Sequence, residues 1–251
     1  MTKIALILGY GPKDFNAGQS FSEIKTNTPY GDTSGTISHG KINNNDIYVL
    51  QRHGNDKTIP SFMVNFKANI FALYEIGCEY IIATSVCGSL REEICPGEIV
   101  IFDQFINLST HRELTFTDKL DIEKLNHSAL HKPFSDEIRD CLIESCVKLG
   151  ITTHTKGSVL AVDGPRQSTR AESNLYRQWG ADVINTTTAP EAILAHELQI
   201  KYASLSLCTF YDSWRTDIAP ALRAEKQQLI DSNGNMLLQV INTAISVLCN
   251  N

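Results

Sequence analysis

The chain has 251 residues, 42% of them hydrophobic and 20% charged, and these values predict one compact α/β domain over residues 1–251. The formal net charge of −6 argues against a nucleic-acid-binding protein, which would need a broad basic surface. An anionic ligand must therefore be held by a few local side chains and not by the field of the whole protein.

The cysteines and the apolar segments predict the compartment. Seven cysteines are present, an odd number without a Cys-x-x-Cys pair, and most lie in apolar stretches such as the one ending at Cys208. This usage is typical of buried thiols in a reducing compartment. The apolar run Ile4–Leu8 is too short for a secretion signal, and no run has the length of a membrane span. We therefore expect a cytoplasmic protein with no membrane partner.

Short apolar runs predict the strands of a sheet. Several of them are continuously apolar, as expected for strands that are covered on both faces. The predicted strands are Ile4–Leu8, Thr36–His39, Ile47–Leu50, Tyr80–Ala83, Ile99–Phe102, Ser158–Val162, Asp182–Ile184 and Tyr202–Leu207. Asn43-Asn44-Asn45 separates the second and third runs and predicts a hairpin turn.

Helical periodicity lies between these strands. Met63, Phe66, Ile70 and Leu73 fall on one helix face, and Gly77 predicts the end of that helix. Glu172 predicts a capping box with Ser168 or Thr169 as the cap. Other helices are predicted around Ile138, Cys141, Leu142 and Cys146, from a Thr188/Glu191 capping box through Leu198, and over Ala224–Leu248. The alternation of strands and helices indicates an α/β fold, whose ligands bind where strands end.

The segment after the first strand is Gly9-Tyr10-Gly11-Pro12. It lacks the third glycine of a dinucleotide fingerprint, because Asp14 stands there, and Pro12 removes an amide donor. A tight turn that faces a ligand fits these residues better than a dinucleotide site.

Polar side chains follow two other predicted strands. Arg52 and His53 supply the donors of a phosphate clamp, although a solvated loop pair is equally compatible with the local sequence. Thr84 and Ser85 bring hydroxyls that either bond a phosphate or a sugar or cap the next turn.

The last two predicted strands also end in polar residues. Thr186, Thr187 and Thr188 form either a neutral anion site at a helix N-terminus or a set of caps, and Thr188 is expected to cap. Asp212 lies among aromatic residues. This arrangement suits either base stacking beside one acid or a core cluster of Tyr211 and Trp214 beside a surface carboxylate.

A histidine pair raises the question of a metal. His127 and His131 are four residues apart, a spacing that suits two ligands on one helix face. No third ligand accompanies them, so we expect no metal site.

Taken together and in this order, these segments resemble the trimeric purine nucleoside phosphorylase family, and above all its methylthioadenosine phosphorylase branch. The resemblance runs through Tyr30-Gly31, Arg52-His53-Gly54, Val64–Asn69, Cys87–Glu93, Gly164-Pro165-Arg166, Arg170-Ala171-Glu172 and Asn185–Glu191. It implies a single-domain phosphorylase/hydrolase-like fold with a central mixed sheet flanked by helices. It also implies phosphorolysis of methylthioadenosine or a related purine nucleoside to a free base and a pentose 1-phosphate, in a homotrimer without metal or organic cofactor.

The same resemblance implies the roles of individual residues. Phosphate would be held by Tyr10, Arg52, His53, Ser85 and Thr187. Val86 and Thr186 would border the sugar, Ser168 and Phe210 would lie near the base, and a residue near His127 would reach the 5′ end from a neighbouring subunit. His53 and Asp212 would be catalytic, with Asp212 facing the purine.

Three residues depart from the family pattern. Tyr10 replaces a hydroxyl residue that is usually Thr, Thr186 replaces a Met beneath the sugar, and Phe210 replaces a purine-facing Asp. Loss of a general acid costs on the order of 10²–10⁴ in rate. The alternatives are therefore an active phosphorylase, a hydrolase that uses water, or a nucleoside-binding protein with little phosphorolysis.

Overall fold

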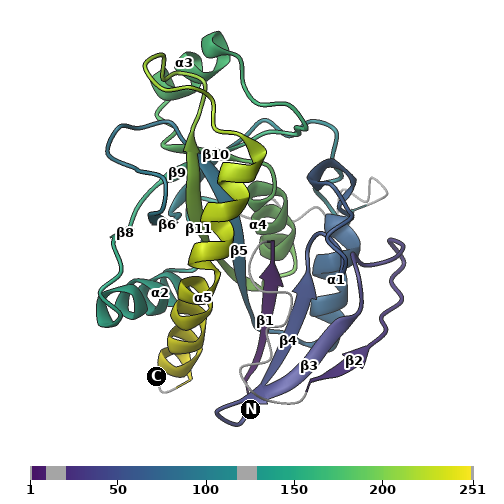
Figure 1. Ribbon diagram of the computed structural model, residues 1–251. Helices are drawn as coiled ribbons and strands as arrows, with labels where there is room; N and C mark the ends of the chain where they lie inside the picture. Colours follow the sequence, from purple (N-terminus) through teal and green to yellow (C-terminus); the bar gives the residue numbers. More distant parts are fainter. Residues whose placement is uncertain (1, 10–20, 118–128, 250–251) are drawn as a thin grey trace.

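The computed structural model describes residues 2–9, 21–117 and 129–249. Its strands form one mixed sheet that crosses the molecule (Figure 1). In chain order they are β1 (Lys3–Leu8), β2 (Ser22–Ile24), β3 (Ile37–Ile42), β4 (Asn45–Gln51), β5 (Tyr80–Ser89), β6 (Ile99–Ile101), β7 (Gln104–Asn107), β8 (Thr153–His154), β9 (Ser158–Ala161), β10 (Val183–Asn185) and β11 (Lys201–Tyr211). The main path runs β2-β3-β4-β1-β5-β10-β9-β7, and β11, β6 and β8 branch from β5.

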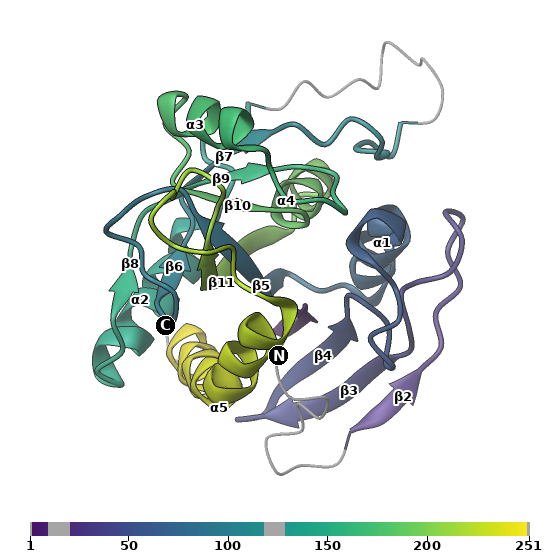
Figure 2. The same cartoon turned by 45° about the horizontal axis from the view of Figure 1, so that its top comes forward.

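Helices cover both faces of the sheet. They are η1 (Ser61–Met63), α1 (Phe66–Ile76), α2 (Asp136–Lys148), α3 (Arg170–Gln178), α4 (Thr188–Glu197) and α5 (Arg223–Leu248). Figure 2 shows α2 and α5 on one side of the central strands and α1 and α4 on the other. The fold expected from the sequence, a central mixed sheet with flanking helices, is confirmed.

Strand β1 shows why both faces must be covered. Its side chains alternate, as the two-residue period of a strand requires. Ile4 and Leu6 are buried in the cluster that includes residues of α2 and α5, whereas Ala5 and Ile7 are buried in the cluster that includes residues of α1 and α4. A strand between two cores carries no polar face, which explains its continuous apolar run.

Several local predictions are confirmed. Asn43 and Asn44 adopt φ values of 49° and 64° in the hairpin between β3 and β4, the left-handed conformation that asparagine tolerates. Gly77 ends α1 with φ 85°. Thr169 and Glu172 form the capping box of α3.

Other local predictions are wrong. Met63 lies in η1 and is 67% exposed, because Asn65 caps α1 and the helix begins only at Phe66. The Thr188/Glu191 capping box does not form. Thr187 is the cap residue of α4, and the carboxylate of Glu191 binds Arg52.

The extents of strands also differ from the expectations. β5 and β11 continue well past their predicted ends, to Ser89 and Tyr211. Thr84 and Ser85 therefore lie inside a strand and not in a turn. The short strands β2, β7 and β8 were not predicted, because they are mostly polar or only two to four residues long.

A gap in the pairing of β5 positions the candidate site. β11 pairs with one edge of β5 from Tyr80 to Ser89. On the other edge, parallel β1 pairs with β5 up to Thr84, and antiparallel β10 pairs only from Gly88. Residues 85–87 lie between these two partners, and the carboxyl ends of β1 and β10 approach them from opposite directions. This is a topological switch point of the sheet, where α/β folds bind ligands.

Candidate active site

A cleft of about 540 Å³ opens at this gap. Of the side chains predicted for the site, it brings together His53, Ser85, Val86, Thr186 and Thr187. The remaining lining residues are Gly9, Lys57, Thr58, Ile59, Pro60, Ser61, Pro165, Arg223 and Gln227. Lys57 and Arg223 are cations, and no Asp or Glu is among these lining residues, so the cleft is a positive region in a protein of net charge −6.

Arg52 lies behind the cleft and does not line it. Its Nε donates to Oε1 of Glu191 at 2.5 Å, its Nη2 donates to Oε2 at 2.9 Å, and its Nη1 donates to the carbonyl of Thr84 at 2.6 Å. The hydroxyl of Tyr202 also donates to Oε2 of Glu191. A Cβ at Gly9 would lie 2.1 Å from Nη1 of Arg52, so only glycine permits this approach.

The ring of His53 has a defined orientation. Its Nδ1 lies 2.9 Å from the carbonyl oxygen of Ile59 and must donate there, because a carbonyl only accepts. Burial, followed by the nearby cation of Arg52, lowers the pKa of His53. The imidazole is therefore neutral at pH 7, with its Nδ1 proton held by the backbone.

Hydroxyls surround the gap in β5. Ser85 bonds Ser206 of β11 at 3.0 Å, which fixes its side chain in the strand. Thr187 is the cap residue just before α4, yet its side chain makes no cap hydrogen bond, and it lines the cleft. The N-terminus of α4 thus presents a hydroxyl and the positive end of the helix dipole to the cleft.

Arg112 ties together two loops of the cleft. Its Nη1 donates to the carbonyl of Thr186, and its Nη2 donates to the carbonyl of Asp163 at 3.1 Å. Its Nε forms an ion pair with Asp163 at 3.2 Å, and the side chain is almost fully buried. The loops after β9 and β10 carry Pro165 and Thr186 into the cleft. This residue was not predicted for the site, because it follows no predicted strand.

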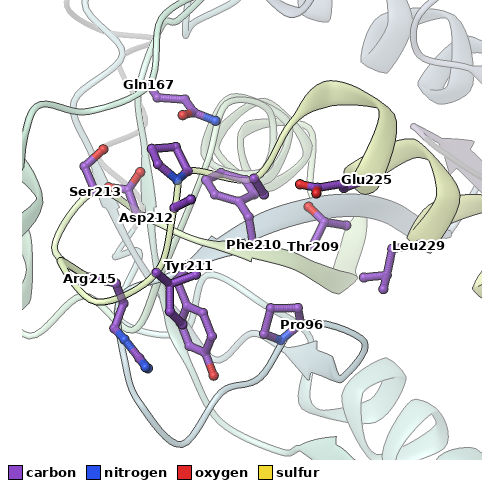
Figure 3. Close-up of a pocket in the computed structure, with 14 residues that line it drawn as sticks. Pro96, Gln167, Thr209, Phe210, Tyr211, Asp212, Ser213, Arg215, Glu225 and Leu229 are labelled. Atoms are coloured by element: carbon purple, nitrogen blue, oxygen red, sulfur yellow. The ribbon is translucent and has the colours of Figure 1, made fainter.

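A second cavity of about 240 Å³ lies beside the end of β11 and contains two of the three residues predicted near the base, Phe210 and Asp212 (Figure 3). The register of β11 against β5 shifts between Cys208 and Phe210. Such a bulge turns consecutive side chains toward one side. Thr209, Phe210, Tyr211 and Asp212 consequently all line the cavity.

Asp212 is buried, with 3% of its surface exposed, so the alternative prediction that it is a surface carboxylate is wrong. Trp214 is buried, as expected of a core aromatic residue. Oδ2 of Asp212 is buried without a hydrogen-bond partner in the described part of the chain. Burial raises the pKa of Asp212, while the hydroxyls of Ser173 and Ser168 act in the opposite direction. An orphaned buried carboxylate oxygen in a cavity wall is an acceptor for a ligand.

The other predicted site residues lie elsewhere. Ser168 lines a neighbouring cavity with Gly164 and Arg166, and its carbonyl accepts a bond of 2.6 Å from Ser213, the residue after Asp212. Tyr10 and His127 lie outside the described residues. The sequence did not predict three charged or polar lining residues, Lys57, Arg223 and Gln227. For Arg223 and Gln227 the only signal was their position at the start of the predicted last helix.

The thiols are all free in the structure. Cys95 is the exposed one, and the hydroxyl of Tyr211 lies 3.3 Å from its sulfur, at the wall of the second cavity. Hydrogen bonding to Cys95 is the largest cause that raises the pKa of Tyr211, to about 12. The phenol is therefore neutral at physiological pH.

Within residues 2–9, 21–117 and 129–249, no group of three His, Cys, Asp or Glu side chains is placed to hold a metal ion. The described helices also include none that is long and apolar enough to span a membrane.

Comparison with known proteins places this fold and site in a family. Residues 3–246 match the family described as the phosphorylase superfamily. The chain is 41% identical to S-methyl-5'-thioadenosine phosphorylase from Danio rerio, over 98% of this chain and 89% of the relative. It is 42% identical to the enzyme of that name from Xenopus tropicalis, over 97% and 88%.

Solved structures agree with the sequence relatives. Methylthioadenosine phosphorylase from Schistosoma mansoni in complex with adenine superposes with a TM-score of 0.93 at 29% identity, covering 100% of this chain and 93% of that one. A mutant of the Schistosoma enzyme in complex with methylthioadenosine gives 0.91 with the same identity and coverage. The chain therefore belongs to the phosphorylase superfamily.

Proposed function

We propose that the protein is a nucleoside phosphorylase that cleaves the N-glycosidic bond of methylthioadenosine or a related purine nucleoside with phosphate. The products are a free base and a pentose 1-phosphate. The supporting observation is the juxtaposition of a positive, hydroxyl-lined cleft with a cavity lined by Asp212, whose Oδ2 has no hydrogen-bond partner in the described part of the chain. Relatives about 40% identical over most of the chain are named for this reaction.

Phosphate binds in the cleft at the gap of β5. Ser85 and Thr187 donate their hydroxyls, and the N-terminus of α4 adds its dipole. Neutral His53 accepts a hydrogen bond at Nε2 from the hydroxyl of monohydrogen phosphate, because its Nδ1 donates to the carbonyl of Ile59. Arg52 contributes from behind through its charge and by holding the carbonyl of Thr84, the residue before Ser85.

The nucleoside spans from the cleft to the second cavity. Val86 and Thr186 border the sugar, between the phosphate groups and the base. Asp212 accepts a hydrogen bond from a donor on the base, and Phe210 forms part of the cavity wall. Ser168 acts through the Ser213 contact, which fixes the loop that carries Asp212.

This arrangement lowers the barrier in two ways. It holds phosphate beneath the anomeric carbon, which converts a bimolecular attack into one within a complex. It also places fixed dipoles and charges around a transition state with a cationic sugar and an anionic base. The proposed enzyme needs no metal or organic cofactor, acts in the cytoplasm, and is a homotrimer.

The test is release of free base from a panel of purine nucleosides, with and without phosphate. Phosphate-dependent release of adenine from methylthioadenosine, with formation of the pentose 1-phosphate, is expected. Release at equal rates without phosphate would identify a hydrolase. Binding by calorimetry without turnover at high protein concentration would identify a nucleoside-binding protein and overturn the proposal.

A further inference from the structure

The first turns of α5 border both the cleft at the gap of β5 (the phosphate cleft) and the second cavity (the base cavity). Arg223 and Gln227 line the phosphate cleft, whereas Glu225 and Leu229 line the base cavity (Figure 3). A nucleoside that extends from one to the other must therefore pass this end of α5. Of the described lining residues of the phosphate cleft, none is an apolar side chain from α5. The side of the sugar that faces α5 thus meets a cation and an amide.

The phosphate cleft has room and charge for more than the co-substrate phosphate. Its volume of about 540 Å³ is that of a pocket for a whole small molecule. Phosphate is bound by Ser85, Thr187 and His53. Lys57 belongs to the same loop as His53, and its charge is among those that lower the pKa of that imidazole, so this cation serves the phosphate. Arg223 is a second lining cation, and it comes from a different segment.

The stability of the fold does not explain Arg223. It is the first residue of α5, where the positive end of the helix dipole disfavours a cation. In the described part of the chain, its guanidinium has no hydrogen-bond or ion-pair partner. Arg166 and Arg215, in contrast, pair with Glu172 and Asp217 at 2.7 Å each. A guanidinium that lines a ligand cleft in this state presents its planar fork to a carboxylate or a phosphate group.

We infer that the nucleoside carries an anionic group at its 5′ position, a carboxylate or a phosphate monoester, and that Arg223 binds this group. The inference rests on the proposed phosphorylase function and names the substrate class of that site. With the base in the base cavity and the anomeric carbon over phosphate, the 5′ carbon is the part of the sugar that extends a substituent toward α5. The sugar hydroxyls are neutral and a methylthio group is apolar, so neither needs a guanidinium. The reaction is unchanged: phosphate replaces the base, and the 5′ group stays on the pentose 1-phosphate.

The experiment measures kcat/KM on two pairs of substrates that differ in the charge of the 5′ group. The first pair is methylthioadenosine and its carboxymethylthio analogue, which adds a carboxylate to the same thioether. The second pair is adenosine and adenosine 5′-monophosphate. Wild type is expected to prefer the anionic member of at least one pair about tenfold, because hydrogen bonds to charged groups contribute that factor. The pair that shows the preference identifies the group as a carboxylate or a phosphate, and a preference in both pairs shows that either group binds.

Arg223→Gln removes the cation and keeps a polar side chain at the start of α5. It is expected to raise KM for the anionic nucleoside about tenfold and to change KM for phosphate and kcat/KM on the neutral substrates less than about threefold. Its stability to urea should equal or exceed that of wild type, because a cation leaves the helix N-terminus. Arg223→Lys should retain part of the preference. Lys148→Gln is the matched control: it removes an exposed cation on α2 and should retain all of it.

Three results would contradict the inference. Equal kcat/KM of wild type on both members of each pair would overturn it, while cleavage of methylthioadenosine would leave the proposed function standing. A rise of KM for phosphate with every nucleoside in Arg223→Gln would place Arg223 at the co-substrate, which also overturns the inference alone. A wild-type protein that cleaves none of the four substrates in the presence of phosphate would overturn both.

Discussion

The guanidinium of Arg52 and the carboxylate of Glu191 form a two-point pair in which both side chains are buried, with 1% and 0% of their surfaces exposed. The pair links the loop after β4 to the fourth residue of α4. It therefore joins two segments that supply the phosphate cleft. Removal of one partner would leave a buried charge without its counterion.

Glu191→Gln is accordingly expected to lower the free energy of unfolding by about 3 kcal/mol. The measurement is urea denaturation at pH 7. Glu144→Gln is the control, because Glu144 pairs with Lys148 on the exposed face of α2 and should cost less than about 0.5 kcal/mol. Similar losses for the two variants would contradict the importance given to the buried pair.

Thr187→Val is expected to raise KM for phosphate about tenfold or more and to leave KM for the nucleoside nearly unchanged. A hydrogen bond to a charged ligand contributes about 1.5–3 kcal/mol, and the hydroxyl of Thr187 makes no cap bond that the fold would lose. Thr243→Val, at a half-buried site on α5 that does not line the cleft, serves as control. A change only in nucleoside affinity would place Thr187 at the sugar.

Arg112→Lys is expected to raise KM for the nucleoside about tenfold, because lysine has no fork to hold the carbonyls of Thr186 and Asp163 together. Arg139→Lys is matched to it. Arg139 is also buried and donates to the carbonyls of Phe102 and Thr155 at 2.7 Å each, away from the cleft. Both variants should lose stability; a comparable KM effect in both would contradict the role of Arg112.

Asp212→Asn tests the raised pKa of Asp212. Between the ordinary value of 3.8 and the raised value, the folded state binds more proton than the unfolded state. Stability from this group is therefore complete below 3.8 and is lost as the pH rises through the folded pKa. The Asn variant should lack this loss, so its free energy of unfolding relative to that of wild type should rise from pH 4 to pH 7. Its activity should be lower than that of wild type. Stability curves that stay parallel would contradict the shift.

Met63→Glu tests the proposed homotrimer. Met63 and Phe62 are 67% and 49% exposed on η1, and the preceding Pro60 and Ser61 line the cleft. An apolar rim beside a site suits a subunit contact. Light scattering should give a trimer for wild type and a smaller species for the variant. Val147→Glu, at another exposed apolar residue, should stay trimeric; a monomeric wild type would contradict the proposal.

The sequence alone was informative where local chemistry decides the structure. Apolar runs revealed the central strands because both sheet faces are buried, and Asn43-Asn44 and Gly77 marked conformations that few residues adopt. The sequence was not sufficient where a residue far away along the chain decides what a side chain contacts. Glu191 has the spacing of a capping residue, but Arg52, far away in the sequence, binds its carboxylate. The pairing gap of β5 depends on strand directions, which residue patterns do not encode.

The site was predicted in the same uneven way. Ser85, Val86, Thr186 and Thr187 all line one cleft as predicted, although Ser85 and Val86 lie inside β5 and not after its end. Arg112 was missed, because its importance comes from carbonyls that other segments supply.

The contact between Tyr211 and Cys95 places a natural labelling site beside the base cavity, from which ligand binding can be followed. Cys95 is the exposed thiol of the described chain, and its partner lines the base cavity. A thiol-reactive fluorophore would therefore attach at the rim of that cavity without any engineered residue. Occupation of the cavity by a purine should alter both the labelling rate and the emission of the attached dye, so ligand binding can be followed even in variants that no longer turn over.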